Sequence, residues 1–207
     1  NQSRWREIMK ILVAGATGNT GIRLVKELAQ RGHQPVALVR ESSDTAKLPD
    51  NAQQRLGDLT DLQDDVTDGC EVVIFAAGSG GDTSAEMTDK VDRDGAIRLI
   101  DIAEKSDVRR FVMLSSVGAD DPDPESELAH YLEAKHAADE RLKSSNLDYA
   151  ILRPVSLTDD GPTGSVRLGD DADPKGKAAR GDVAVLLADA AEQDEWIGAI
   201  KLMETAY

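Results

Sequence analysis

The sequence predicts an α/β fold, a doubly wound parallel sheet with helices on both faces in a single domain. Short apolar runs alternate with segments whose apolar residues recur at helical spacing along nearly the whole chain. The apolar runs are mostly continuous, which is typical of parallel strands buried on both faces. Right-handed crossovers then place helices on each face of the sheet. A length of 207 residues suits one domain with a sizeable core.

The elements of the first half follow from local pattern. Lys10–Ala14 is an apolar run that predicts a first strand, and the segment after it predicts a helix over Asn19–Gln30 that Gly32 ends. "QPVALVR" predicts a second strand and "AQQRL" a weaker third one. "TDLQDDVTDG" (60–69) predicts a short helix opened by its first threonine, and the almost wholly apolar "EVVIFAA" a fourth strand.

The second half continues the alternation. Helices are expected at 87–105 and 127–144, with "RRFVMLSS" as the fifth strand between them and "DYAILRP" as the sixth after them. The Gly/Pro/Asp-rich stretch 158–181 predicts an irregular excursion. A helix at 182–191 and a strand around 199–203 then close the chain.

The domain organisation is expected to be simple. Residues 1–8, "NQSRWREI", have no periodicity and precede Met9, so we interpret them as a leader or a cloning remnant. Residues 9–207 form the predicted domain, and its segment from about 155 to 181 is expected to cover the substrate.

Charge and composition exclude several classes of protein. The formal net charge of -15 disfavours nucleic acid and anionic membranes, which are bound by basic surfaces. No apolar run is long enough to span a bilayer, and no Cys/His cluster has metal-ligand spacing, so no metal is expected. The single cysteine, Cys70, favours the reducing cytoplasm. We expect a cytoplasmic monomer or small homo-oligomer with a small-molecule substrate. The acidic surface is either ordinary solvation or adaptation to salt.

The glycine-rich segment "GATGNTG" points to a dinucleotide. Gly15, Gly18 and Gly21 lie between the first strand and the first helix, where a turn, a pyrophosphate and close helix packing each require a glycine. The helix N-terminus offers free N–H groups to phosphates. Thr17, Asn19 and Thr20 complete this candidate phosphate loop.

The end of the second strand bears on the choice of cofactor. An acid there usually binds a free ribose 2′-hydroxyl, whereas an arginine accommodates a 2′-phosphate. The strand ends in Arg40, followed by Glu41, which favours the other cofactor. We predict NADP(H), with NAD(H) possible.

Six motifs together give the chain a family resemblance. They are "GATGNTG", "GDLTD", "AAG", "RRFVMLSSVGA", "YLEAK" and "DYAILRP", and the tail "ARGDVAVLLADAA" with "GAIKLME" extends the likeness over nearly all of the chain. The sequence resembles the atypical branch of the short-chain dehydrogenase/reductase superfamily. More closely, it resembles small NAD(P)-binding proteins of the epimerase/dehydratase-like or NmrA-like kind.

The resemblance implies a Rossmann-like domain and a set of cofactor contacts. Asp58 and Leu59 would flank the adenine. The further expected contacts along the cofactor are Ala76, Ala77, Gly78, Ser115, Pro154 and Val155.

The candidate catalytic residues are Tyr131, Lys135 and Ser116. Tyr131 and Lys135 are four apart on a predicted helix and share one face. A nearby ammonium would lower the pKa of the phenol, and the lysine could also contact the nicotinamide ribose. The tyrosine would then protonate a carbonyl oxygen during reduction. Extended family members place their hydroxyl one position after Ser116, where this chain has Val117, so the hydroxyl is either Ser116 or missing.

Three functions therefore compete. The first is an NADP-dependent reductase of a small carbonyl or quinone-like substrate. The second is a nucleotide-sugar epimerase or dehydratase, although such enzymes need a larger C-terminal domain than the chain offers after Pro154. The third is a cofactor-binding redox sensor without turnover.

His33, His130 and His136 lack partners at catalytic spacing and are expected at the surface, while Cys70 is expected to pack inside.

Overall fold

The computed structural model describes residues 7–78 and 84–207. Residues 1–6 of the predicted leader lie outside the described residues. The strands are β1 Lys10–Ala14, β2 Gln34–Val39, β3 Gln53–Leu56, β4 Val72–Phe75, β5 Arg110–Leu114, β6 Asp148–Pro154, β7 Ser156–Thr158, β8 Val166–Leu168, β9 Lys177–Ala179 and β10 Ile200–Thr205. The helices are α1 Asn19–Gln30, α2 Ala85–Thr88, the π-helix η1 Asp89–Gly95, α3 Ala96–Glu104, α4 Ala129–Lys143, the 3₁₀ turn η2 Gly169–Asp171, α5 Arg180–Glu192 and the 3₁₀ turn η3 Asp194–Trp196.

Eight strands form one central sheet. Their order is β3-β2-β1-β4-β5-β6-β10-β8, and every pair is parallel except β10 with β8 at one edge. The order reverses direction beside β1, so the carboxyl ends of β1 and β4 open a crevice where ligands of such sheets bind. The predicted α/β class with a doubly wound, mostly parallel sheet is confirmed.

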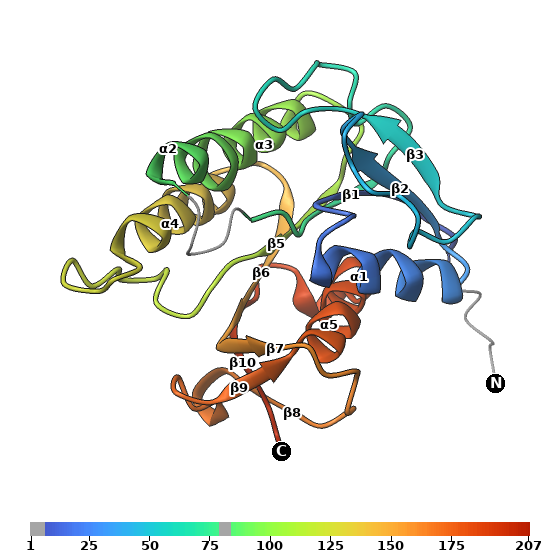
Figure 1. Cartoon of the computed structure of the whole chain (residues 1–207). Coiled ribbons are helices and arrows are strands. Elements are labelled where there is room, and N and C mark those ends of the chain that lie inside the picture. The colour runs from blue at the N-terminus through green and yellow to red at the C-terminus, as the bar shows by residue number, and fades with distance from the viewer. Residues whose placement is uncertain (1–6, 79–83) are drawn as a thin grey trace.

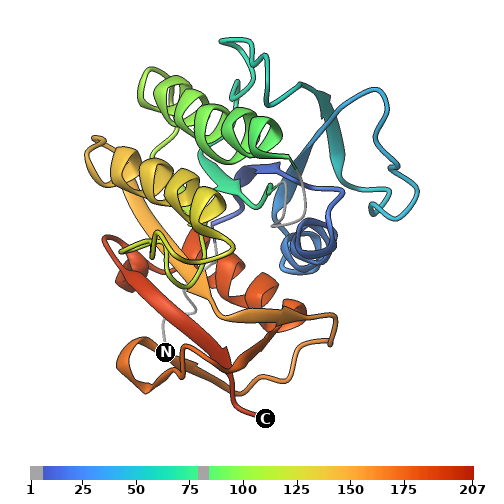
Figure 2. The same cartoon turned by 60° about the vertical axis from the view of Figure 1, so that its left-hand side comes forward.

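Helices cover both faces of the sheet. Figure 1 shows α3 and α4 on one face and α1 and α5 on the other, and Figure 2 gives the same arrangement from a second direction. Successive side chains of β1 enter opposite cores, since Ile11 and Val13 pack with α1 and α5 while Leu12 and Ala14 pack with α3. The continuous apolar runs of the sequence reflect this burial on both faces.

Three elements differ from expectation. The predicted helix at 60–69 is a series of turns, because the Asp58 carboxylate accepts hydrogen bonds from the backbone N–H and the hydroxyl of Thr60 and so closes a local turn. The helix expected at 87–105 starts earlier and contains η1. The stretch 158–181, predicted to be irregular, contains β8, β9 and η2, and β9 pairs with β7 in a small second sheet.

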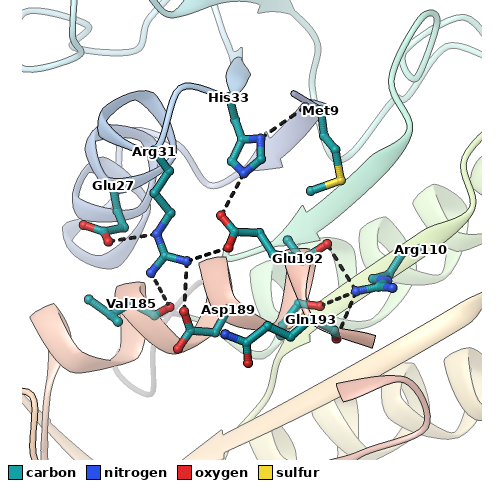
Figure 3. A network of polar contacts seen from close by, with 11 residues as sticks. Met9, Glu27, Arg31, His33, Arg110, Val185, Asp189, Glu192 and Gln193 are labelled. Carbon is teal, nitrogen blue, oxygen red and sulfur yellow. Dashed lines mark hydrogen bonds and ion pairs between the residues drawn. The ribbon is translucent and has the colours of Figure 1, made fainter. Parts of the chain in front are cut away.

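A buried polar network fastens α5 to the rest of the domain at the amino ends of the strands. His33 is buried rather than at the surface as expected: its Nδ1 accepts the backbone N–H of Met9 at 3.1 Å, and its Nε2 lies 2.8 Å from Glu192. Figure 3 shows Arg31 beside it, which binds Glu27, Asp189 and Glu192. The partner of His33 lies 159 residues away, so local sequence could not reveal it.

Arg110 belongs to the same region and caps α5. This arginine is 2% exposed, and its Nη1 donates to the carbonyl oxygens of Ala190, Ala191 and Gln193 at 3.1–3.2 Å. Its Nη2 donates to Asp194 at 2.7 Å. A cation at a helix C-terminus satisfies carbonyls that have no partner within the helix and opposes the helix dipole.

Within residues 7–78 and 84–207, no helix is long and apolar enough to cross a bilayer. No three His, Cys, Asp or Glu side chains gather there in a way that could hold a metal ion. Cys70 is buried, as expected. His130 is exposed, and His136 is half-buried with its Nδ1 2.7 Å from the carbonyl oxygen of Ala119.

Candidate active site

The glycine loop is built by close approach of backbone segments. Gly15 has a φ of 81°, which L side chains rarely adopt, and a Cβ there would lie 2.4 Å from the backbone nitrogen of Ala77. A Cβ on Gly21 would lie 1.8 Å from the carbonyl oxygen of Gly15. The absence of a side chain at Gly15 and Gly21 therefore lets the ends of β1 and β4 and the start of α1 pack closely together.

Gly18 is different because it faces open space. A Cβ there would meet only the Gly15 carbonyl oxygen, at 3.4 Å, and its φ of -76° suits any residue. Gly18 is the N-cap of α1, no side chain caps this end, and the first turn carries no acidic residue. The free N–H groups and the positive end of the helix dipole are thus available to an anion.

A cavity of about 880 Å³ borders the glycine loop. It is lined by the glycine loop, by the residues that follow β2, β3, β4 and β5, and by parts of η1, α4 and the C-terminal segment. Its lining residues are Gly15, Thr17, Gly18, Asn19, Thr20, Leu38, Arg40, Ser43, Gly57, Asp58, Leu59, Thr60, Ala76, Ala77, Gly78, Met87, Lys90, Val91, Leu114, Ser115, Tyr131, Lys135, Leu157 and Arg180.

Most of the site residues expected from the sequence line this one cavity, but Gly21, Ser116, Pro154 and Val155 do not. Gly21 is packed under Gly15. The hydroxyl of Ser116 donates to the backbone carbonyl of Val117 at 3.0 Å. Val155 is 2% exposed and packs in the core beside α5. Pro154 is buried at the end of β6.

Several lining residues were not anticipated. They are Leu38, Ser43, Gly57, Thr60, Met87, Lys90, Val91, Leu114, Leu157 and Arg180. Some of them, such as Ser43 and Gly57, follow the carboxyl ends of predicted strands, and this position alone could have indicated them. Leu157 and Arg180 come from the segment whose short strands have no readable periodicity.

The end of the cavity beside β2 carries Arg40 and Asp58. Arg40 is exposed, and its backbone N–H donates to the hydroxyl of Ser43 at 2.9 Å. Hydrogen bonds from Thr60, with a smaller contribution from the charge of Arg40, lower the pKa of Asp58. The Asp58 carboxylate therefore stays ionised as an acceptor at neutral pH.

The other end carries Tyr131 and Lys135 on one face of α4. Lys135 is 1% exposed, and its Nζ lies 5.3 Å from the centre of the Phe75 ring. Burial lowers the pKa of this ammonium, while the carboxylates of Asp92 and Asp139 act in the opposite direction. Both carboxylates are buried.

The expectation that Lys135 lowers the pKa of Tyr131 is wrong in this structure. Burial raises the pKa of the phenol, and the charges of Asp92 and Asp139 raise it further. Tyr131 therefore keeps its proton at neutral pH and in moderate alkali.

Asp139 ties this end of the site to the sheet. The carboxylate lies one turn after Lys135 and accepts a hydrogen bond from the hydroxyl of Ser115 at 2.5 Å. It also accepts from Arg153 at 3.2 Å. Ser115 in turn lines the cavity. The serine that lines the cavity at the end of β5 is thus Ser115 rather than Ser116.

Comparison with known proteins identifies the family of this site. A family model described as NAD(P)H-binding matches residues 15–194. The chain belongs to the NAD(P)H-binding family. It is similar to the uncharacterized sugar epimerase YhfK of Bacillus subtilis, with 36% identity over 182 residues that cover 85% of each protein.

Two solved structures of similar proteins extend the match over nearly the full length. The first is a putative NAD-dependent epimerase/dehydratase from Bacillus halodurans, with a TM-score of 0.89, 37% identity, and 96% of this chain and 94% of that chain covered. The second is the oxidoreductase ylbE of Lactococcus lactis, with a TM-score of 0.84, 31% identity, and 96% and 91% covered. The expected NAD(P)-binding, epimerase/dehydratase-like family is confirmed.

The residues present fit the dinucleotide of this family. Gly15 and Gly21 make the tight turn that a pyrophosphate-binding loop needs, and the open space at Gly18 lets a phosphate reach the backbone. The uncapped start of α1 supplies N–H donors for it.

Proposed function

We propose that the protein is an NADP(H)-dependent oxidoreductase of the short-chain dehydrogenase/reductase type that reduces a small carbonyl or quinone-like compound. The observation that carries the proposal is the single cavity that joins the glycine loop and Arg40 to Tyr131, Lys135 and Ser115. A phosphate-binding loop and a proton-donating phenol within one cavity are the two parts that a nicotinamide-dependent reductase requires.

Arg40 supports the choice of NADP(H) over NAD(H). It stands directly after β2, lines the cavity and has its guanidinium exposed to an incoming ligand. A planar guanidinium forms paired, charge-assisted hydrogen bonds with a phosphate, which a ribose hydroxyl does not offer.

The proposed chemistry uses a proton held on Tyr131. Bound NADPH would supply a hydride to the carbonyl carbon. Because Tyr131 is half-buried and its pKa is raised, the phenol is protonated and can donate a hydrogen bond to the carbonyl oxygen. Its proton passes to that oxygen as the carbon–oxygen double bond is reduced. The tyrosinate left behind, with Lys135 one helical turn away, then takes a proton from solvent.

Two alternatives each have a supporting observation. The printed descriptions of similar proteins include a sugar epimerase and an epimerase/dehydratase, which supports chemistry on a nucleotide sugar. However, the C-terminal residues build β10 of the central sheet and α5 against its face, so this segment is part of the dinucleotide-binding fold itself. A redox sensor without turnover is supported by Ser116, whose hydroxyl donates to the backbone carbonyl of Val117.

The proposal is tested by NADPH oxidation on a panel of aldehydes, ketones and quinones. A reductase consumes NADPH with at least one of them and yields the corresponding alcohol or hydroquinone in equal amount. An epimerase shows no net oxidation and interconverts a nucleotide sugar, while a sensor binds NADPH and consumes none. Either of the last two results would replace the reductase assignment.

A further inference from the structure

Most of the charged residues that line the cavity are cations, whereas acids predominate in the chain as a whole. Among its described lining residues, Arg40, Lys90, Lys135 and Arg180 are cations, and Asp58 is the acid. The chain as a whole has a formal net charge of -15. A lining in which cations outnumber acids offers binding partners to anionic ligands.

Arg180 is the cation of the cavity lining to which the proposed function assigns no ligand. Arg40 is proposed for the 2′-phosphate and Lys135 for the reacting end, and Lys90 is half-exposed and paired with Glu86 at 2.9 Å. Arg180 is only 22% exposed, and its Nη1 lies 2.6 Å from Asp159. Because Asp159 is 75% exposed, this ion pair contributes little to stability. Stability therefore does not explain an arginine at this place.

The backbone on both sides of Arg180 is held rigidly. The N–H of Ala179 donates to the buried hydroxyl of Thr205 at 2.8 Å, and the N–H of Gly181 donates to the carbonyl of Asp160 at 3.1 Å. A Cβ on Gly181 would lie 2.2 Å from the nitrogen of Pro162, so the two segments touch. A fixed base reduces the entropy lost when the guanidinium binds a ligand.

The next residue, Asp182, strengthens this base. Its buried carboxylate accepts hydrogen bonds from Thr163, Gly164 and Thr205. These bonds join the first turn of α5 to the loop before β8 and to β10. The start of α5, where Arg180 stands, is thereby anchored to both segments.

The wall that holds Arg180 also presents an apolar side chain to the cavity. Leu157 of β7 lines the cavity, and β7 pairs with β9, the strand that ends one residue before Arg180. The side chains of Leu157 and Arg180 together suit an organic molecule with an apolar part and an anionic group. The phosphates of a dinucleotide have other donors, since the N-terminus of α1 and Arg40 are available to them.

We propose that Arg180 binds a carboxylate of the substrate, so that the preferred substrate is a small carbonyl compound carrying a carboxylate group. This inference rests on the proposed reductase function. The guanidinium would form a paired, charge-assisted hydrogen bond with the two carboxylate oxygens and set which carbonyl compounds bind well.

The test compares benzoylformate with its methyl ester, which has the same ketone and ring but no charge. Calorimetry measures the binding of each to the protein saturated with NADP⁺, and NADPH affinity is measured separately by its fluorescence. We expect the wild type to bind benzoylformate at least roughly 10-fold more tightly than the ester, the usual effect of a hydrogen bond between charged groups. Arg180→Met should abolish this preference, and Arg180→Lys should retain part of it.

Arg23→Met is the matched control. Arg23 also contacts Asp159, donating to its carbonyl oxygen at 2.9 Å, but it does not line the cavity. Its loss should leave the preference for benzoylformate unchanged, and NADPH affinity should stay within about twofold in every variant.

Two results would overturn the inference. One is equal binding of the acid and the ester by the wild type. The other is a loss of NADPH affinity in Arg180→Met as large as the loss for benzoylformate, which would make Arg180 a ligand of the cofactor phosphates. Failure of the proposed function itself looks different, because the wild type would then not bind NADPH or would oxidise none of it with any carbonyl compound.

Discussion

Replacement of Gly18 by valine separates cofactor binding from folding. The backbone at Gly18 has a φ of -76°, and an added Cβ meets no heavy atom closer than 3.4 Å. The cost to the free energy of unfolding is therefore that of a poorer N-cap residue, about 1 kcal/mol or less. For a domain of this size that corresponds to a fall in Tm of roughly 2–4 °C.

The same side chain occupies the space through which a pyrophosphate reaches the start of α1. Loss of two charge-assisted hydrogen bonds from the loop N–H groups, at about 1.5–3 kcal/mol each, weakens NADPH binding at least roughly 100-fold. Gly21→Ala is the contrasting variant, because its Cβ would stand 1.8 Å from the Gly15 carbonyl oxygen and the backbone has to move. We expect it to lower the free energy of unfolding by about 3 kcal/mol or more.

Fluorescence titration with NADPH and thermal unfolding by circular dichroism measure both effects. We expect a folded Gly18→Val protein that binds NADPH at least roughly 100-fold more weakly and a destabilised Gly21→Ala protein. Undiminished NADPH affinity in Gly18→Val would refute the placement of the phosphates. A Gly18→Val protein as unstable as Gly21→Ala would refute the packing argument.

Three further predictions concern the cofactor, the acid and the fold. Arg40→Ala should abolish a preference for NADPH over NADH in binding titrations, and equal affinities in the wild type would remove the assignment of Arg40. Since burial raises the pKa of Tyr131, its acid form persists in alkali, so kcat should stay level from about pH 7 to about pH 10, and a decline centred below about pH 9 would contradict this role. Arg110→Met removes four hydrogen bonds at the end of α5 and should lower the free energy of unfolding by about 3 kcal/mol in urea titrations. The exposed neighbour Arg109 is the control, and its replacement by methionine should stay within about 0.5 kcal/mol of the wild type.

The sheet and the glycine loop were predictable because their causes are local. An apolar run such as Lys10–Ala14 is continuous in sequence and buried on both faces in the fold. Gly15 and Gly21 also have local causes, since Gly15 has a φ of 81° and a Cβ on Gly21 would meet the Gly15 carbonyl oxygen. The face shared by Tyr131 and Lys135 follows from helical spacing alone.

Features that depend on distant partners were not predictable. The sequence around His33 predicts an exposed polar turn residue, but its burial depends on Glu192 near the other end of the chain. The raised pKa of Tyr131 depends on burial and then on Asp92, a residue of η1, which packs against α4. Arg180 reaches the cavity through three-residue strands, which are too short to show a period.

The role of Tyr131 as the acid of a reductase is tested by the rate of NADPH oxidation in Tyr131→Phe. The ring is retained, so the fold and the NADPH affinity should be unchanged. On a carbonyl substrate that the wild type reduces, kcat should fall by roughly two to four orders of magnitude, the usual contribution of a positioned general acid. An unchanged kcat in the phenylalanine variant would contradict the account.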